Sequence, residues 1–160
     1  MNRFFRKMLV AAAAAMVLPG VAFAADGDDA QAVRRQLLQY EQALNASSTD
    51  KVMALYAADA VFMPQNSMPA VGRQAVRESY DRVFGAIRLN VRFEIDEVGV
   101  LSPGWAYART RSNGTVQVLG SAAPPGPESN QELFLLHREP DGQWRFARYI
   151  FSATTPPAQR

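Results

Sequence analysis

The sequence predicts an α+β domain in which three N-terminal helices cover one face of a curved antiparallel sheet. Three observations support this prediction. Apolar residues in the first half of the chain recur at helical spacings, residues from position 89 onward alternate between apolar and polar as half-buried strands do, and short turn-forming segments separate these strands. Because three short helices cannot cover a strongly bent sheet completely, we expect a cone-shaped domain with one open end.

Two segments have the apolar spacing of a helix that is buried on one face. Large apolar side chains are separated by four, three and four positions in both segments. They are Val33, Leu37, Tyr40 and Leu44 in the first, and Val76, Tyr80, Val83 and Ile87 in the second. A short helix that is capped by Ser48 or Thr49 should lie between them and end at Tyr56. The preceding residues 25–30, with three Asp and one Gly, should form a solvent-exposed arm.

The strands follow from shorter patterns. Residues 60–63 are apolar and end at Pro64, which lacks a backbone donor, so they should form a short buried strand. After the third helix, the alternation that starts at position 89 changes phase before position 98. A change of phase is typical of a β-bulge, which we expect near Asp96 and Glu97.

The remaining chain should form two hairpins. A strand should begin at Trp105, turn at Asn113-Gly114 and return over residues 115–119, because Asn-Gly is a strong hairpin signal. Residues 121–130, with three Pro and one Gly, should form a mobile loop. Strands at 131–138 and 143–152 should then pair around a Pro-Asp-Gly turn.

The first 24 residues have the parts of a secretory signal peptide. Three basic residues precede an apolar stretch that is too short to span a bilayer, and Ala22-Phe23-Ala24 is a small-residue cleavage motif. We expect cleavage after Ala24, a periplasmic or secreted product and no membrane anchor. The mature chain, residues 25–160, has the length of one domain.

Charge and residue usage exclude several classes of function. Removing Arg3, Arg6 and Lys7 from 17 basic residues leaves 14 against 15 acidic residues, and no basic run remains, so we expect no nucleic-acid partner. There is no Cys, and His137 is the only His, which excludes disulfides, thiolate catalysis and multi-His metal sites. We also expect neither a metal nor a cofactor.

Three strings of residues resemble the SnoaL-like branch of the nuclear transport factor 2-like superfamily. They are LYAADAVFMP from Leu55, the pair Gly72-Arg73 at the start of the third helix, and LLHREPDGQWRFARYIFS up to Ser152. The resemblance covers residues 30–152 and implies a cone-shaped, cystatin-like fold with a pocket. This fold carries isomerases, cyclases, dehydratases and binding modules, so the resemblance specifies the fold more closely than the activity.

Within this superfamily, ketosteroid isomerase is similar in its three pocket tyrosines. Tyr40, Tyr56 and Tyr80 stand at matching places, which implies that Tyr40 donates a hydrogen bond to a developing enolate. The family's general base, however, is an Asp at the place where Pro64 stands here. Its second oxyanion donor falls near Phe134, two residues after Glu132. These departures argue against ketosteroid isomerase activity.

The last strand is also similar to the association domain of calcium/calmodulin-dependent kinase II. That family has His at two places where Arg148 and Ile150 stand here. The resemblance therefore implies that the pocket is kept while its catalytic groups differ.

We expect the pocket between the helices and the sheet. Its candidate ligand-binding residues are Tyr40, Tyr56, Met63, Tyr80, Phe84, Trp105, Tyr107, Arg109, Phe134 and Tyr149. The candidate catalytic residues are Tyr40, Glu132 and Asp59. If Glu132 shares the apolar face of Phe134, burial would raise its pKa and suit it to acid or base chemistry, whereas a shift of one residue would turn it to solvent.

Several of these residues also have structural interpretations. The tyrosines suit core packing, and Asp59 suits a turn between helix and strand. Arg109 suits either an acidic ligand or a cross-strand ion pair with Glu94 or Asp96. Methionines near the pocket mouth suit either an irregular apolar ligand or core packing.

Three functional hypotheses follow. The first is an exported homodimer that binds a hydrophobic small molecule in the pocket, because the uncovered sheet face carries enough apolar residues to need a partner. The second is a SnoaL-like or isomerase-type enzyme in which Tyr40 polarises a carbonyl and Glu132 or Asp59 moves the proton, which requires a carboxylate inside the cavity. The third is a structural or immunity-type partner protein, for which the cavity should be filled.

Overall fold

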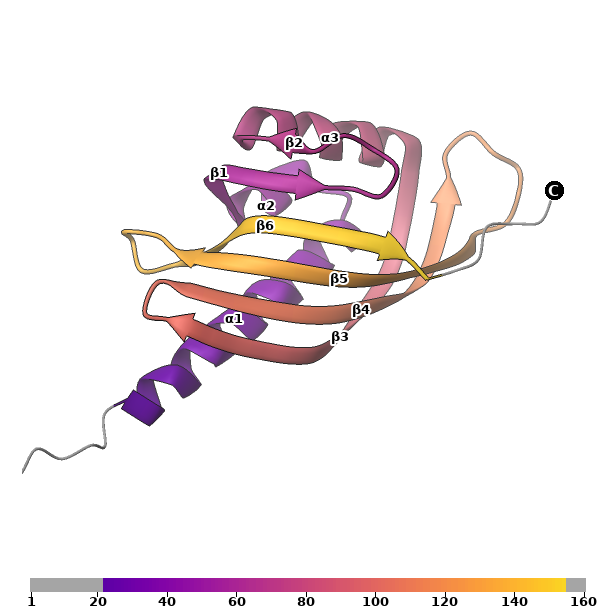
Figure 1. The fold of residues 1–160 in the computed structure, drawn as a ribbon. Helices are drawn as coiled ribbons and strands as arrows, with labels where there is room; N and C mark the ends of the chain where they lie inside the picture. Colours follow the sequence, from indigo (N-terminus) through magenta and orange to yellow (C-terminus); the bar gives the residue numbers. More distant parts are fainter. Residues whose placement is uncertain (1–21, 155–160) are drawn as a thin grey trace, which may run out of the picture.

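Helices come first and strands follow in the computed structural model, which describes residues 22–154 (Figure 1). The elements are α1 (Ala22–Asn45), α2 (Thr49–Ala54), β1 (Tyr56–Met63), β2 (Ala70–Val71), α3 (Arg73–Ala86), β3 (Ile87–Ser102), β4 (Trp105–Val118), β5 (Gly126–Arg138) and β6 (Trp144–Ala153). Residues 1–21 of the expected signal peptide lie outside the described residues. No helix within residues 22–154 is long and apolar enough to cross a membrane.

The six strands form one curved, unclosed sheet in the order β2-β1-β6-β5-β4-β3. β1 runs parallel to β6, whereas the other neighbouring strands are antiparallel. The predicted α+β class is confirmed, with a mixed sheet in place of a purely antiparallel one. α1 crosses one face of the sheet and α3 lies beside β1 and β2 (Figure 1).

The start of α1 differs from the prediction. The expected exposed arm at residues 25–30 was wrong, because these residues belong to the helix. Asp29 gives a physical reason, since its Oδ1 accepts a hydrogen bond from Nε1 of Trp144 at 3.3 Å and lies 3.3 Å from Nη1 of Arg138. These contacts fix the first turns of α1 against the β5–β6 hairpin. The apolar residues of α1 at the predicted helical spacing are buried.

The connection from α2 to β1 is shorter than predicted. Ser48 caps α2 as expected, by accepting a hydrogen bond from a backbone N–H of the first turn, but the helix ends at Ala54 and Tyr56 opens β1. The backbone N–H of Phe146 donates to the Leu55 carbonyl at 2.8 Å. The backbone therefore begins to pair with β6 at the position where the sequence predicted the end of a helix.

The hairpin predicted at Asn113-Gly114 was wrong, because β4 continues through these residues and pairs with β3 on one side and β5 on the other. Gly114 lies opposite Val91, and a Cβ at this glycine would lie 2.0 Å from the Asn90 carbonyl oxygen. Glycine thus permits a close approach of two strands here and makes no turn. The chain turns after β4, and β5 begins at Gly126, within the segment predicted to be a loop.

Two other strand predictions are confirmed. The register between β3 and β4 shifts between Ile95 and Glu97, as the change of phase predicts, and β5 and β6 form the last hairpin. The alternation in β4 also holds. The even-numbered residues 106–112 are buried on the concave face, and their odd-numbered neighbours lie on the outer face.

Candidate functional site

Three tyrosine hydroxyls that the sequence singled out meet in the core. Tyr40 comes from α1, Tyr56 from the start of β1, and Tyr80 from α3. The Tyr80 hydroxyl lies 2.5 Å from that of Tyr40 and 2.8 Å from that of Tyr56, so the three form a chain with Tyr80 in the middle. Each phenol has one proton to donate. Two internal hydrogen bonds use two of the three protons, which leaves one for an acceptor outside the chain.

The phenols are neutral donors at neutral pH, because burial raises the pKa of Tyr40, Tyr56 and Tyr80 well above the ordinary value of 10.0. Tyr40 and Tyr80 line a cavity, whereas Tyr56 is not among its lining residues. The end of the chain that lines the cavity is Tyr40, and its hydroxyl can donate the remaining proton to a ligand when Tyr56 donates to Tyr80 and Tyr80 donates to Tyr40.

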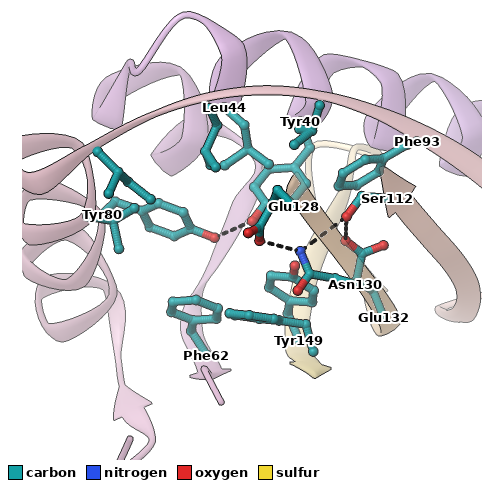
Figure 2. Close-up of a pocket in the computed structure, with 15 residues that line it drawn as sticks. Tyr40, Leu44, Phe62, Tyr80, Phe93, Ser112, Glu128, Asn130, Glu132 and Tyr149 are labelled. Carbon is teal, nitrogen blue, oxygen red and sulfur yellow. Dashed lines mark hydrogen bonds between the residues drawn. The ribbon is translucent and has the colours of Figure 1, made fainter. Parts of the chain in front are cut away.

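The cavity has a volume of about 150 Å³ and lies between α1, α3 and the concave face of the sheet (Figure 2). Most of its wall is apolar. The aliphatic and aromatic lining residues are Leu44, Phe62, Val83, Ile87, Leu89, Val91, Phe93 and Phe151. Its polar groups are the phenols and a cluster from β4 and β5. No basic side chain is among the residues that the structure places around this cavity.

Glu132 faces the cavity from β5, so of its two predicted orientations the structure has the buried one. The residue is 5% exposed. Ser112 donates its hydroxyl proton to one carboxylate oxygen at 2.7 Å, and Thr110 donates to the other. Burial raises the pKa of Glu132, while the two hydroxyl hydrogen bonds act in the opposite direction. A carboxyl group with a raised pKa inside a cavity is suited to bind or move a proton.

The sequence analysis missed two polar lining residues, Glu128 and Asn130. The Asn130 amide nitrogen donates to Glu128 at 2.9 Å and to the Ser112 hydroxyl at 3.3 Å (Figure 2). The other amide atom of Asn130, Oδ1, is buried and has no hydrogen-bond partner among the described residues. A signal existed in the sequence. Positions 128 and 130 continue the alternation of Glu132, but the Pro-rich composition around them indicated a loop.

Three predicted ligand-binding residues on β4 lie on the outer face of the sheet, away from this cavity. Arg109 pairs with Asp96 at 2.8 Å, so of its two predicted roles the structure has the cross-strand ion pair. Tyr107 donates its hydroxyl proton to Glu97 at 2.5 Å. Trp105 is 37% exposed and packs against a histidine ring. The alternation in β4 was predicted correctly, but the pocket was assigned to the wrong one of its two faces.

Two further candidates also lie outside the cavity. Asp59 stands within β1 instead of at a turn, its side chain is 79% exposed, and it lies 3.7 Å from Arg148. This exposure removes it as the carboxylate of the cavity. Met63 lies on the outer face, beside Leu133 and Ile150. Methionines therefore do not form the mouth of the cavity, whose lining residues include none.

The remaining candidates support the cavity wall. Tyr149 lines the cavity, and its ring stacks on that of Phe134 with centroids 4.2 Å apart. Phe134 is fully buried behind it. Phe84 packs against Tyr80 at a centroid distance of 5.7 Å. These two phenylalanines hold the tyrosine rings in place without lining the cavity themselves.

The helices, the curved sheet and the cavity define a nuclear transport factor 2-like protein, and solved structures of this class match the chain. A ketosteroid isomerase-like protein from Erwinia carotovora atroseptica is 31% identical, with 81% of this chain and 98% of that chain covered and a TM-score of 0.77. A scytalone dehydratase-like protein from Novosphingobium aromaticivorans is 18% identical, with 86% and 92% covered and a TM-score of 0.74.

The family follows from the sequence match. The chain belongs to the SnoaL-like domain family, whose model matches residues 37–157. The predicted resemblance to the kinase association domain also has a counterpart, since such a protein from Thiobacillus denitrificans is 19% identical, with 75% of this chain and 93% of that chain covered and a TM-score of 0.61. A comparison with curated proteins gave no match.

We expect Glu132→Gln to change how stability depends on pH. Because the pKa of Glu132 is higher in the folded protein than its ordinary value of 4.5, the stabilisation by its bound proton is fully present below about pH 4.5 and is lost as the pH rises through the folded pKa. As the pH rises from about 4.5 through the folded pKa, the wild type should therefore lose stability relative to the variant. The loss is about 1.4 kcal/mol for each tenfold difference in the proton affinity of Glu132 between the folded and unfolded states.

Urea denaturation of both proteins between about pH 4 and about pH 8 measures the difference in their free energies of unfolding. Glu78→Gln, on the exposed face of α3, is the matched control and should follow the wild type. If the stability of Glu132→Gln also follows that of the wild type at all pH values, the inference that the pKa of Glu132 is raised is wrong.

Proposed function

We propose that this protein binds a small, mostly apolar molecule in its cavity and that Tyr40 donates a hydrogen bond to an acceptor atom of that molecule. The observation that carries the proposal is the apolar cavity with the hydroxyl group of Tyr40 at its wall. A dry cavity of about 150 Å³ in another protein accepts benzene, so a ligand of roughly one ring fits. The open cavity also argues against the structural-partner hypothesis, which requires a filled one.

We expect Val91→Phe to block ligand binding. Val91 lines the cavity from β3, and the larger ring would occupy its volume. Acetophenone, a one-ring ketone, should bind to the wild type and bind about tenfold or more weakly to the variant. Tyr40→Phe should weaken acetophenone by about fivefold, the effect of one hydrogen bond, and leave toluene unchanged.

Isothermal titration calorimetry measures these affinities, and circular dichroism checks that each variant is folded. Val71→Phe is the matched control, because Val71 is 69% exposed and should leave binding unchanged. Equal binding of acetophenone to the wild type and to Val91→Phe, or no binding to the wild type, would contradict the proposal.

A second candidate function is acid–base catalysis on the bound molecule. It is favoured by Glu132, because the structure has a buried carboxyl group in the cavity that Tyr40 also lines, as the enzyme hypothesis requires. Tyr40 would stabilise an enolate oxygen while Glu132 takes the proton from the neighbouring carbon. The place of the ketosteroid isomerase base remains without a carboxylate, since Pro64 stands there.

Exchange of the methyl protons of acetophenone in deuterium oxide tests this role by NMR. The wild type should accelerate the exchange, and Glu132→Gln should lower the acceleration by about a hundredfold while acetophenone affinity is retained. Equal loss of exchange and of binding, or of neither, would remove the catalytic role.

We also propose that the exported protein is a homodimer. Leu133 and Ile150 are paired across β5 and β6 on the outer face and are 49% and 45% exposed. Adjacent exposed apolar residues of this size are typical of a contact with another chain. Arg109 and Arg111, with their carboxylate partners, would then form the charged rim of the contact.

Native mass spectrometry of protein purified from the export compartment tests dimerisation and cleavage together. We expect a particle of two chains that each begin at Ala25, and Leu133→Glu should give single chains because it would bury an unpaired charge. A chain that retains Met1 would contradict cleavage, and a wild type that stays monomeric at micromolar concentrations would contradict the dimer.

A further inference from the structure

The polar end of the cavity is acidic. Glu128 and Glu132 both line it, at alternate positions on the same side of β5. Asn130 lies between them in sequence and donates its amide hydrogen to Glu128. Its Oδ1 atom adds a buried acceptor that has no partner in the described part of the chain. This end of the cavity therefore offers acceptor atoms to a ligand, and two of the groups carry negative charge when ionised.

No positive group from residues 22–154 balances these carboxylates within the cavity. The lining residues among the described part of the chain include no Lys, Arg or His. Arg111, from the same part of β4, lies on the outer face, where Glu94 and Asp96 bind it at 2.8 Å. Within residues 22–154, Glu132 receives side-chain hydrogen bonds from Thr110 and Ser112 alone, and both donors are neutral. A buried carboxylate without a cation is unfavourable, so a positive ligand would be stabilised there.

Aromatic rings surround the same space. Phe62 stacks on Tyr80 at a centroid distance of 5.1 Å and on Tyr149 at 5.3 Å, and these three rings line one side of the cavity. Phe93 and Phe151 line it as well. The faces of aromatic rings attract cations, and this attraction is stronger where water is excluded. Carboxylates and aromatic rings together thus favour a cation that has an apolar body.

We propose that the ligand of this cavity is a small amine that is protonated at neutral pH, with its ammonium group beside Glu128, Asn130 and Glu132 and its apolar body between the aromatic rings. The inference rests on the proposed binding function, since it assigns the charge of the ligand in the same cavity. The ammonium group donates to the free Asn130 oxygen and compensates the carboxylates, which a neutral alcohol does only in part.

Three one-ring probes that differ in charge test this inference. Benzylamine is a cation at neutral pH, benzyl alcohol is neutral and benzoate is an anion. Calorimetric titration of the wild type should give benzylamine an affinity at least about tenfold above that of benzyl alcohol, and benzoate should not bind measurably. The preference should persist at high salt, because the carboxylates are shielded from solvent ions.

Substitutions of the two glutamates test whether their carboxylates cause the preference for benzylamine. Glu128→Gln and Glu132→Gln should each reduce the preference for benzylamine over benzyl alcohol by about tenfold while benzyl alcohol still binds. Glu78→Gln, on the exposed face of α3, is the control and should leave the preference unchanged. Since Glu128 is only partly buried, its substitution provides a folded variant even if Glu132→Gln is destabilised.

The outcomes separate the two proposals. If acetophenone and benzyl alcohol bind but benzylamine has no advantage, or if both glutamine variants retain that advantage, the amine inference is overturned and the binding function stands. If no probe binds to the wild type, the binding function fails and the amine inference fails with it.

Discussion

The position of Tyr40 holds the site together. Its ring lies edge-on to five other aromatic rings at centroid distances of 5.3–6.4 Å, and these rings come from α3, β3, β5 and β6. Such packing fixes the plane of the ring and hence the direction of its hydroxyl group. The same side chain is thus a core residue and a polar group of the cavity, so the structural and functional interpretations of the tyrosine do not exclude each other.

The sequence predicted the parts of the site that depend on local periodicity. Helical spacing predicted that Tyr40 and Tyr80 are buried, whereas strand alternation left two orientations open for Glu132, of which the structure has the one on the side of Phe134. Alternation does not say which of two faces meets the helices, and for this reason the residues of β4 were assigned to the wrong one. Ala106 and Ala108 carried the missing signal, because small side chains leave room for α1.

The rest of the site depends on pairing between distant segments. The long β4 provides an edge for β5 as far back as Gly126, so residues that local composition assigns to a loop become a strand. Gly114 contributes by letting β3 approach closely at the middle of this pairing. Pairing with a distant strand overrides the local propensity of this segment. This pairing places Glu128 and Asn130 in the wall of the cavity.

The two ends of the cavity come from separate parts of the chain. The three hydrogen-bonded phenols belong to residues 40–80, whereas the polar cluster around Glu132 belongs to β4 and β5. The structure gives hydrogen bonds within each group but none between these two groups among the described residues. Substitutions at three alternate positions of one strand can therefore change the charge presented inside the cone while the phenol chain stays intact. A substitution at one end therefore removes no hydrogen bond from the other end.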